Sequence, residues 1–199
     1  MRRVKRKAFA AALAALLGLA SPGPAFAETG PPLKGAFEDA MTLFEEPMEA
    51  PDDAFTTSGG QEMTLADFRG RVVVLNFWAT WCAPCVEEMP SLDRLQARLG
   101  SEGLTVVALS GDRGGMTAVE PFFERLELTH LEIFLDPKNL LSRRLGIRAL
   151  PTTLVIDRQG RIVAGLQGAT AWDAPEAIEF FRYYLGDAPQ RSGLLKTGG

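Results

Sequence analysis

Residues 72–85 of this 199-residue chain read VVVLNFWATWCAPC. The first seven of them form an almost unbroken apolar and β-branched run, which is typical of a strand covered on both faces. Strands of this kind lie in the centre of α/β sheets. We therefore expect a buried central strand that ends just before Cys82 and Cys85, the only two cysteines of the chain.

The two cysteines stand at the start of a predicted helix. Beyond Cys85, apolar residues recur at helical spacing, and Gly100 follows as a plausible helix stop. Pro84 suits a first helical turn, because proline has no N–H to lose there. The helix N-terminus stabilises a thiolate, so we expect Cys82 to be the nucleophile. Cys85, one turn further on and less exposed, would resolve the mixed disulfide.

Two structural roles for the cysteines are less well supported. A structural zinc site normally needs four protein ligands, whereas this chain offers no further Cys and a single His, His130, which we expect at the surface or in a loop. A disulfide between residues so close in sequence would also constrain little of the unfolded chain. The pattern therefore favours a redox role, with no metal site.

Patterns elsewhere in the chain predict a βαβ half followed by a ββα half, with an extra helix and strand between them. Upstream, residues 37–44 show helical spacing and predict a short amphipathic helix closed by residues 45–47. Downstream, the expected elements are a strand at 104–110, a helix at 119–126, a strand at 131–135, a helical turn at 140–145, a hairpin at 152–157 and 161–166, and a helix at 177–185.

The N-terminus has the pattern of a secretory signal peptide. A basic start is followed by an apolar run at residues 8–20 and by the small-residue pattern Ala25-Phe26-Ala27. The run is short for a membrane span, although an uncleaved anchor remains the alternative. We therefore expect export to the periplasm. The predicted organisation is a signal peptide at 1–27, a linker and short helix at 28–50, one domain at 51–186 and a flexible tail at 187–199.

Charge argues against nucleic-acid binding. The chain has 21 basic and 25 acidic residues, and the predicted leader carries five of the basic ones and no acidic one. Without the leader, 21 − 5 leaves 16 basic residues, so the formal net charge is 16 − 25, or −9. Such a surface repels phosphate backbones. We expect a monomer with protein partners.

The order of motifs resembles the thioredoxin superfamily, and within it the exported TlpA/ResA/DsbE-like branch. The resemblance rests on NFWATWCAPC at 76–85, EEMP at 87–90, LPTT at 150–153, VIDRQG at 155–160 and the segment 168–172. It implies a thioredoxin-like α/β fold: a central mixed β-sheet flanked by helices, with an N-terminal extension and a helix-strand insert.

The same resemblance implies further site residues. Pro151 would follow a cis peptide bond, face the cysteines and help to hold an extended piece of a partner. The backbone of Leu150 would pair with that partner like one more strand. Glu88 would handle protons, with a solvated helix charge as the alternative. Cytosolic thioredoxins carry a buried Asp where this chain has Asn76, which makes Glu88 the better candidate for a base acting on Cys85.

Residues around the cysteines would form the contact surface for a partner. We assign substrate binding to Trp81, Ala83 and Pro84 together with Leu150. A plain packing role for Trp81 remains an alternative.

The implied function is that of a thiol-disulfide oxidoreductase, in particular a periplasmic protein-disulfide reductase. Its partners would be exported thiol or disulfide proteins, such as those of cytochrome c maturation or metal-site assembly. Electrons would come from a membrane donor of the CcdA/DsbD type, and no cofactor beyond the Cys82–Cys85 disulfide would be needed. Operation as an oxidant remains open. The alternative function is a copper metallochaperone of the same fold, because soft thiolates suit Cu(I).

Overall fold

A computed structural model describes residues 30–186. The predicted signal peptide and tail lie outside these residues. The helices are α1 (Gly35–Ala40), η1 (Leu65–Phe68), α2 (Ala83–Leu99), η2 (Gly100–Glu102), α3 (Met116–Arg125), α4 (Leu140–Arg144) and α5 (Pro175–Leu185). The strands are β1 (Thr42–Glu49), β2 (Phe55–Thr57), β3 (Glu62–Met63), β4 (Val72–Trp78), β5 (Leu104–Ser110), β6 (Phe134–Leu135), β7 (Thr152–Ile156) and β8 (Arg161–Gln167).

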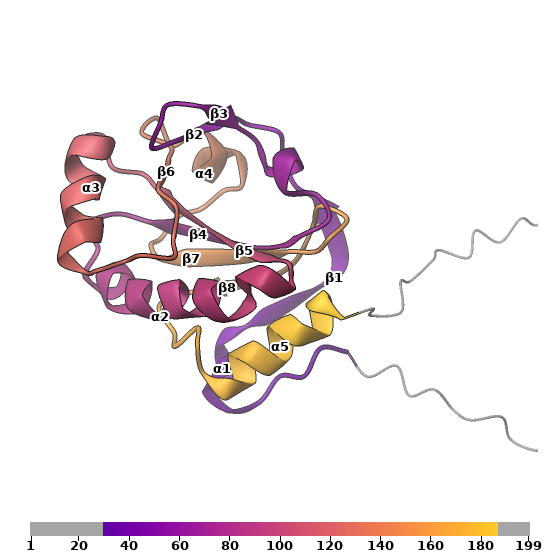
Figure 1. Ribbon diagram of the computed structural model, residues 1–199. Helices are drawn as coiled ribbons and strands as arrows, with labels where there is room; N and C mark the ends of the chain where they lie inside the picture. The colour runs from indigo at the N-terminus through magenta and orange to yellow at the C-terminus, as the bar shows by residue number, and fades with distance from the viewer. Residues whose placement is uncertain (1–29, 187–199) are drawn as a thin grey trace, which may run out of the picture.

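The strands form one mixed sheet in the order β1-β8-β7-β4-β5-β6-β2-β3. β4, β5 and β6 run parallel to one another, whereas β7 is antiparallel to both β4 and β8. Figure 1 shows α2 and α5 on one side of this sheet and α4 on the other. The predicted α/β architecture is confirmed, including a βαβ half, a ββα half and α3 with β6 between them.

The central strand β4 is buried along its whole length. Successive side chains of a strand point to opposite faces of the sheet. Val72, Val74 and Trp78 therefore enter the core shared with α1, α2, α3 and α5. Val73 and Leu75 enter a second core with side chains of η1 and α4. This burial on both faces is what the apolar run predicted.

Helix α2 carries its apolar residues on the stripe that faces the sheet. Met89, Leu92, Leu95 and Leu99 are fully buried, and the helix is followed by Gly100 as predicted. The stripe fixes α2 across β4 and β5, so its first turn lies at the end of β4.

The segment after α1 differs from the prediction. Residues 42–49, expected to complete a helix and a linker, form the edge strand β1, which pairs with β8. Met41 already has an extended backbone, so the helix ends at Ala40. Phe44 packs in the second core, and a Cβ added at Gly165 of β8 would meet its ring. A glycine thus leaves the space that this aromatic ring occupies.

The place of β1 bears on the domain boundary. The segment predicted as a linker and short helix at 28–50 contains a strand of the same sheet as β8. We propose that the domain begins with α1 rather than at residue 51. Prolines in sheets occur on edge strands and at irregularities of the pairing. Pro47 fits this rule, because it lies between the two segments of the edge strand β1 that pair with β8.

The insert also contains less strand than predicted. β6 comprises Phe134 and Leu135 alone, while residues 131–133 lie outside the sheet.

Of the helices in residues 30–186, not one combines the length and the apolar character that crossing a membrane requires.

We predict that Leu92→Ala destabilises the fold by about 2–5 kcal/mol, because it removes a fully buried side chain between α2 and the sheet. The matched control is Leu140→Ala, at a leucine with 45% of its surface exposed, which should change stability by about 0.5 kcal/mol or less. Urea unfolding of both variants measures the difference. Equal effects would show that α2 is not held by this stripe.

Candidate active site

Cys82 and Cys85 form a disulfide at the point where β4 leads into α2. The S–S distance is 2.06 Å and the Cα atoms are 5.3 Å apart. Cys82 is the residue that caps the N-terminus of α2, and Pro84 lies in the first turn, which contains no acidic residue. The predicted placement of the pair at a helix N-terminus is confirmed.

The two cysteines differ in their exposure to solvent. Cys85 is fully buried, whereas 6% of Cys82 is exposed and its neighbours Trp81, Ala83 and Pro84 are exposed. Trp81 has 74% of its surface exposed. A packing role for this indole is therefore wrong, and it presents a large apolar surface beside Cys82. A partner can approach Cys82 but not Cys85.

The loop before β7 lies next to the end of β4. The Leu150–Pro151 peptide bond is cis, as the resemblance implied. Thr152 pairs with Phe77, so Pro151 lies at the level at which β4 ends and the cysteine segment begins. Pro151 is buried and Leu150 is half-buried. The structure thus brings Pro151 and Leu150 to the end of β4 that leads to Cys82.

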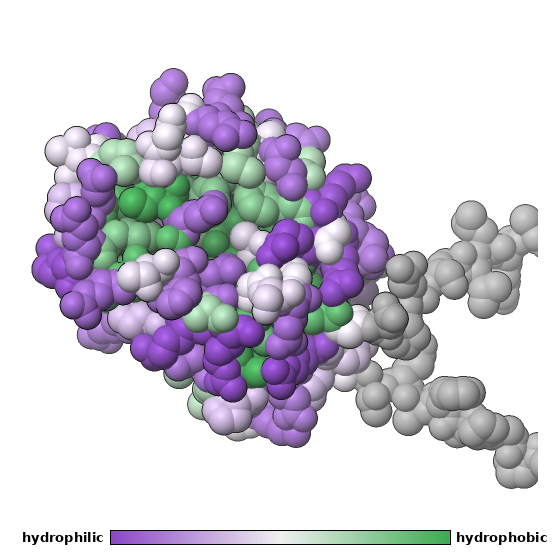
Figure 2. All heavy atoms as spheres, viewed as in Figure 1, coloured by the Kyte–Doolittle hydropathy of each residue, from purple (hydrophilic) through white to green (hydrophobic). Residues whose placement is uncertain are grey.

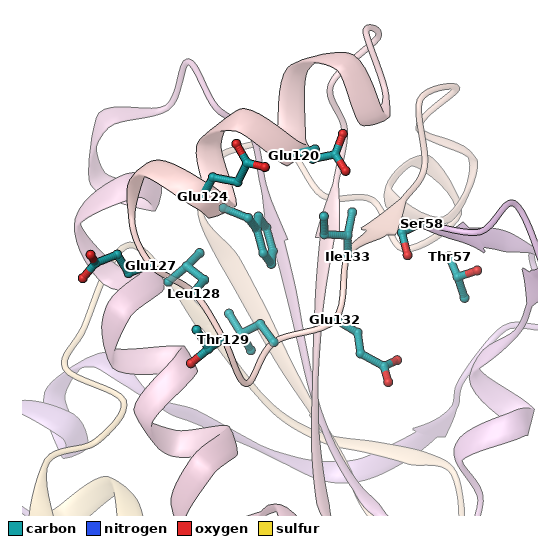
Figure 3. Close-up of a pocket in the computed structure, with 11 residues that line it drawn as sticks. Thr57, Ser58, Glu120, Glu124, Glu127, Leu128, Thr129, Glu132 and Ile133 are labelled. Carbon is teal, nitrogen blue, oxygen red and sulfur yellow. The ribbon is translucent and has the colours of Figure 1, made fainter.

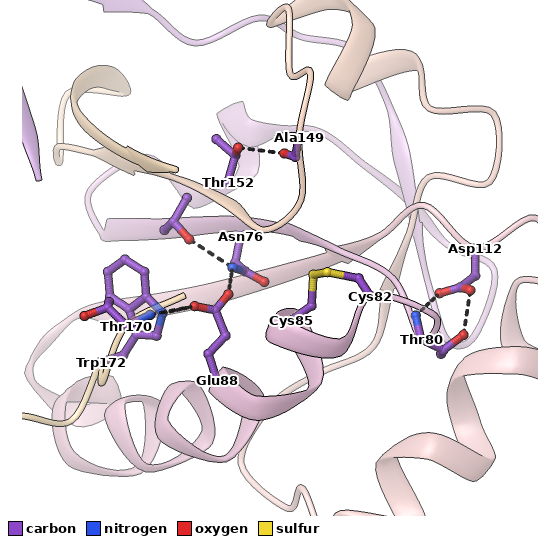
Figure 4. The surroundings of a disulfide bond; sticks show 11 residues. Asn76, Thr80, Cys82, Cys85, Glu88, Asp112, Ala149, Thr152, Thr170 and Trp172 are labelled. Carbon is purple, nitrogen blue, oxygen red and sulfur yellow. Dashed lines mark hydrogen bonds between the residues drawn. A yellow bond between two sulfur atoms is a disulfide. The ribbon is translucent and has the colours of Figure 1, made fainter. Parts of the chain in front are cut away.

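Glu88 is buried rather than solvated, with 3% of its surface exposed, whereas the neighbouring Glu87 is exposed. Its carboxylate accepts hydrogen bonds from Asn76 Nδ2 at 2.8 Å, Trp172 Nε1 at 2.9 Å and Thr170 N at 3.3 Å (Figure 4). The alternative of a surface charge is therefore wrong. Burial raises the pKa of Glu88 to about 7, and the three donors limit that rise.

Trp172 and Ser91 extend this network, and neither was assigned a role from sequence. Trp172 is fully buried, and its backbone N–H donates to Ser91 Oγ at 3.1 Å. Trp172 lies inside the motif at 168–172 that carried part of the resemblance. That was the only sequence signal for it, because its partners on α2 lie more than 80 residues away in the chain.

Asp112 is a further residue that sequence patterns missed. It lies just after β5 and is buried, and it accepts hydrogen bonds from Thr80 N at 2.9 Å, Thr80 Oγ1 at 2.7 Å and Ser110 Oγ at 2.8 Å. From sequence, Asp112 belongs to an ordinary turn after a strand. In the structure it fixes the segment that leads into Cys82 (Figure 4).

His130 has a partner that the sequence did not reveal. Its ring Nδ1 lies 2.8 Å from Asp93 Oδ2, and Asp93 also accepts the backbone N–H groups of His130 and Leu131. The ring is about half exposed, as expected for a surface residue. Within residues 30–186, His, Cys, Asp and Glu side chains form no group of three or more that could hold a metal ion.

A pocket of about 1030 Å³ opens in the inserted region. It lies between α3, the segment before β6 and the turn after β2, and neither cysteine lines it (Figure 3). Figure 2 shows this face with apolar side chains in a hollow surrounded by hydrophilic ones. Its lining includes the carboxylates of Glu120, Glu124, Glu127 and Glu132.

A family model described as Redoxin matches residues 45–178, which is more than half of the chain. The chain belongs to the Redoxin family. The thiol-disulfide oxidoreductase ResA of Geobacillus thermodenitrificans is 37% identical to it over 131 residues, which are 65% of this chain and 74% of that protein. ResA of Bacillus thuringiensis is 33% identical over 120 residues, 60% of this chain and 68% of that protein.

A solved structure is similar as well. A protein of Chlorobium tepidum assigned as thiol:disulfide interchange protein DsbE matches with a TM-score of 0.65 and 29% identity, over 72% of this chain and 99% of that one. This Redoxin-family chain is therefore a thioredoxin-superfamily protein of the TlpA/ResA/DsbE-like kind with a thioredoxin-like fold. It is a thiol-disulfide oxidoreductase, as its motifs predicted.

The pKa of Glu88 leads to a prediction about stability. In the unfolded chain Glu88 titrates near its ordinary pKa of 4.5, and in the folded protein near 7. The folded state therefore binds the proton more tightly, so its stabilising contribution is complete below pH 4.5 and is lost as the pH rises to 7. Relative to Glu88→Gln, the free energy of unfolding of the oxidised protein should fall by on the order of 3 kcal/mol as the pH rises from 4.5 to 7.

Urea unfolding at pH 4.5, 5.5, 6.5 and 7.5 measures this difference. Glu87→Gln is the matched control, because Glu87 is the exposed neighbour on the same helix and should follow the wild-type pH dependence. A constant difference between wild type and Glu88→Gln across the series would contradict a raised pKa.

Proposed function

We propose that this chain is a protein-disulfide reductase that acts in the periplasm on exported proteins through Cys82 and Cys85. The observation that carries the proposal is the asymmetry of the pair: Cys82 caps a helix and reaches the surface, whereas Cys85 is buried one turn before a buried carboxylate. This arrangement suits a nucleophile that meets the partner and a second thiol that releases it.

In the first step, the Cys82 thiolate attacks one sulfur of a partner's disulfide. A Cys82–partner bond forms, the partner's S–S bond breaks, and its other sulfur leaves as a thiolate. The N-terminus of α2 favours the Cys82 thiolate, and its first turn adds no acidic side chain to oppose it. Exposed Trp81 supplies apolar contact to the partner.

In the second step, Cys85 resolves the mixed disulfide. The Cys85 thiol gives its proton to the Glu88 carboxylate, and the resulting thiolate attacks the Cys82 sulfur. The Cys82–Cys85 bond forms and the partner's second sulfur leaves as a thiolate, so the partner gains the two electrons that the pair loses. Cys85 and Glu88 are three residues apart on α2 and share one face of the helix. A carboxylate whose acid form has a pKa of about 7 accepts a proton efficiently at neutral pH.

The partner would bind in an extended form beside the loop before β7. There the backbone of Leu150 would pair with it like an added strand, next to Pro151. Ala83 and Pro84, which are exposed in the first turn of α2, would contact the partner from the other side of Cys82.

The cellular setting of the proposal rests on sequence and resemblance. The N-terminal pattern supports export through a signal peptide at 1–27, and an uncleaved leader would anchor the domain to the membrane. Because an exported reductase must be supplied with electrons, we propose a membrane donor of the CcdA/DsbD type. The proposed partners are exported thiol proteins, such as those of cytochrome c maturation or metal-site assembly.

We predict that Cys85→Ala traps partners. Reduced Cys82 still attacks a disulfide, but no thiol remains to resolve the product, so a stable mixed disulfide accumulates. Insulin serves as a test substrate and periplasmic extract as a source of natural ones, with non-reducing electrophoresis and mass spectrometry as the measurement. Cys82→Ala is the control and should trap much less, because its remaining thiol is buried. Equal trapping by both variants would contradict the assigned roles.

We predict that Glu88→Gln slows resolution of the mixed disulfide by about 10²-fold, because the buried base for Cys85 is lost. Stopped-flow fluorescence with a peptide disulfide separates the attack by Cys82 from the release by Cys85. The Glu87→Gln control should leave both steps unchanged, since Glu87 is exposed. Slowing of the attack alone would argue against a base acting on Cys85.

The direction of electron flow and the copper alternative need separate measurements. A potential near that of thioredoxin, about −270 mV, supports a reductase, and one near that of DsbA, about −120 mV, supports an oxidant. Titration of the reduced protein with Cu(I) tests the metallochaperone. Tight copper binding without insulin reduction would overturn the proposed function.

A further inference from the structure

Asn76 lies in the middle of β4 with its side chain fully buried. The amide nitrogen Nδ2 donates to Glu88 Oε1 at 2.8 Å and to Thr153 Oγ1 at 2.9 Å. A side-chain amide has two N–H hydrogens, so both are used. These two bonds determine how the amide is oriented.

The amide oxygen of Asn76 is left without a partner. Oδ1 is buried, and within residues 30–186 it has no hydrogen-bond donor. Turning the amide over would place this oxygen against the Glu88 carboxylate, which is itself an acceptor, so the observed orientation is the favourable one. Figure 4 shows Oδ1 directed away from Glu88 and towards the Cys82–Cys85 disulfide.

Buried acceptors without a partner are rare and call for an explanation. In the disulfide neither sulfur carries a hydrogen, so the pair has nothing to donate. Reduction changes this, because the fully buried Cys85 becomes an S–H group, which is a weak donor. The other two buried polar atoms without a partner in the described residues, Trp78 Nε1 and Arg158 Nε, are donors and cannot accept that hydrogen.

We propose that Asn76 Oδ1 accepts a hydrogen bond from the Cys85 thiol in the reduced protein. The inference rests on the proposed redox role of the pair. One amide group then contacts both groups of the proton transfer. Its oxygen accepts a hydrogen bond from the Cys85 thiol, and its nitrogen donates one to the Glu88 carboxylate that receives the proton. The transfer leaves a Cys85 thiolate, which forms the bond to Cys82 as the partner's sulfur departs.

The proposal has a directional consequence for the redox equilibrium. The acceptor is satisfied in the dithiol form and unsatisfied in the disulfide form, so Asn76 favours the dithiol. Replacing it with an apolar residue should make the protein a stronger reductant. From the usual contribution of one buried hydrogen bond, we expect Asn76→Leu to shift the equilibrium with glutathione towards the disulfide by about fivefold.

The decisive measurement is the infrared S–H stretching band of Cys85. Cys82→Ser leaves Cys85 as the only thiol of the chain, so its band is observed without interference. We expect the low frequency of a hydrogen-bonded thiol in this variant and the higher frequency of a thiol without an acceptor when Asn76→Leu is added. Asn76→Asp keeps an oxygen at the same place and should keep the low frequency.

Trp172→Phe is the matched control, combined with Cys82→Ser. Like Asn76→Leu it removes one donor from Glu88, but it leaves Asn76 Oδ1 in place. The S–H band should therefore stay at low frequency. In the protein that keeps both cysteines, Trp172→Phe should shift the glutathione equilibrium less than Asn76→Leu does. Should the leucine variant not fold, the Cys85 frequency in Cys82→Ser itself still tests the proposal, because a free-thiol frequency there contradicts it.

A free-thiol frequency in Cys82→Ser, or a band that Asn76→Leu leaves unchanged, would overturn the proposal. The band depends on no substrate and on no direction of electron flow. Failure of the proposed reductase function would appear instead as an absence of insulin reduction by the wild-type protein, with the Cys85 band still at low frequency.

Discussion

The buried carboxylate of Glu88 joins the two halves of the fold beneath the redox pair. It receives hydrogen bonds from Asn76 in β4 and from Trp172 in the segment that connects β8 to α5. Ser91, one turn further along α2, binds the backbone of that same segment. Leaving a buried polar group without its partner costs about 1–3 kcal/mol, and more for a charged one. Glu88 therefore adds polar contacts to both halves at the end of α2 where the cysteines lie, while the apolar stripe packs the rest of the helix on the sheet.

This constraint also determines how the cysteines are presented. With α2 fixed across the sheet, its first turn lies where β4 ends, and Cys82 caps it at the surface. Asp112, just after the neighbouring strand β5, accepts hydrogen bonds from Thr80 and so fixes the short connection from β4 to Cys82. The pairing of β7 with β4 brings Pro151 to the same level. The site is thus assembled from the ends of buried elements, and of the two cysteines only Cys82 keeps some exposed surface.

Sequence patterns predicted the elements whose burial shows as consecutive or regularly spaced apolar residues. The apolar run of β4 and the stripe from Met89 to Leu99 on α2 predicted both elements and the location of the cysteines between them. They were insufficient for β1, whose residues are mostly exposed and which is held by backbone pairing with β8. Phe44 and Phe37 suggested one helix, yet Phe44 packs over Gly165, which is more than 100 residues away in sequence. The spacing of apolar residues within a short segment cannot indicate a contact between residues so far apart in the chain.

The same limit applies to the site, where spacing placed Glu88 on the face of Cys85 but could not show that it is buried. Its donors lie 12, 82 and 84 residues away in the chain. The structure also explains the departure at position 76. An Asp there, as in cytosolic thioredoxins, would place a second carboxylate against Glu88, and like charges so close would keep one of them protonated. Asn76 provides an N–H donor instead, so the buried carboxyl group lies on the helix at Glu88 and not on the strand.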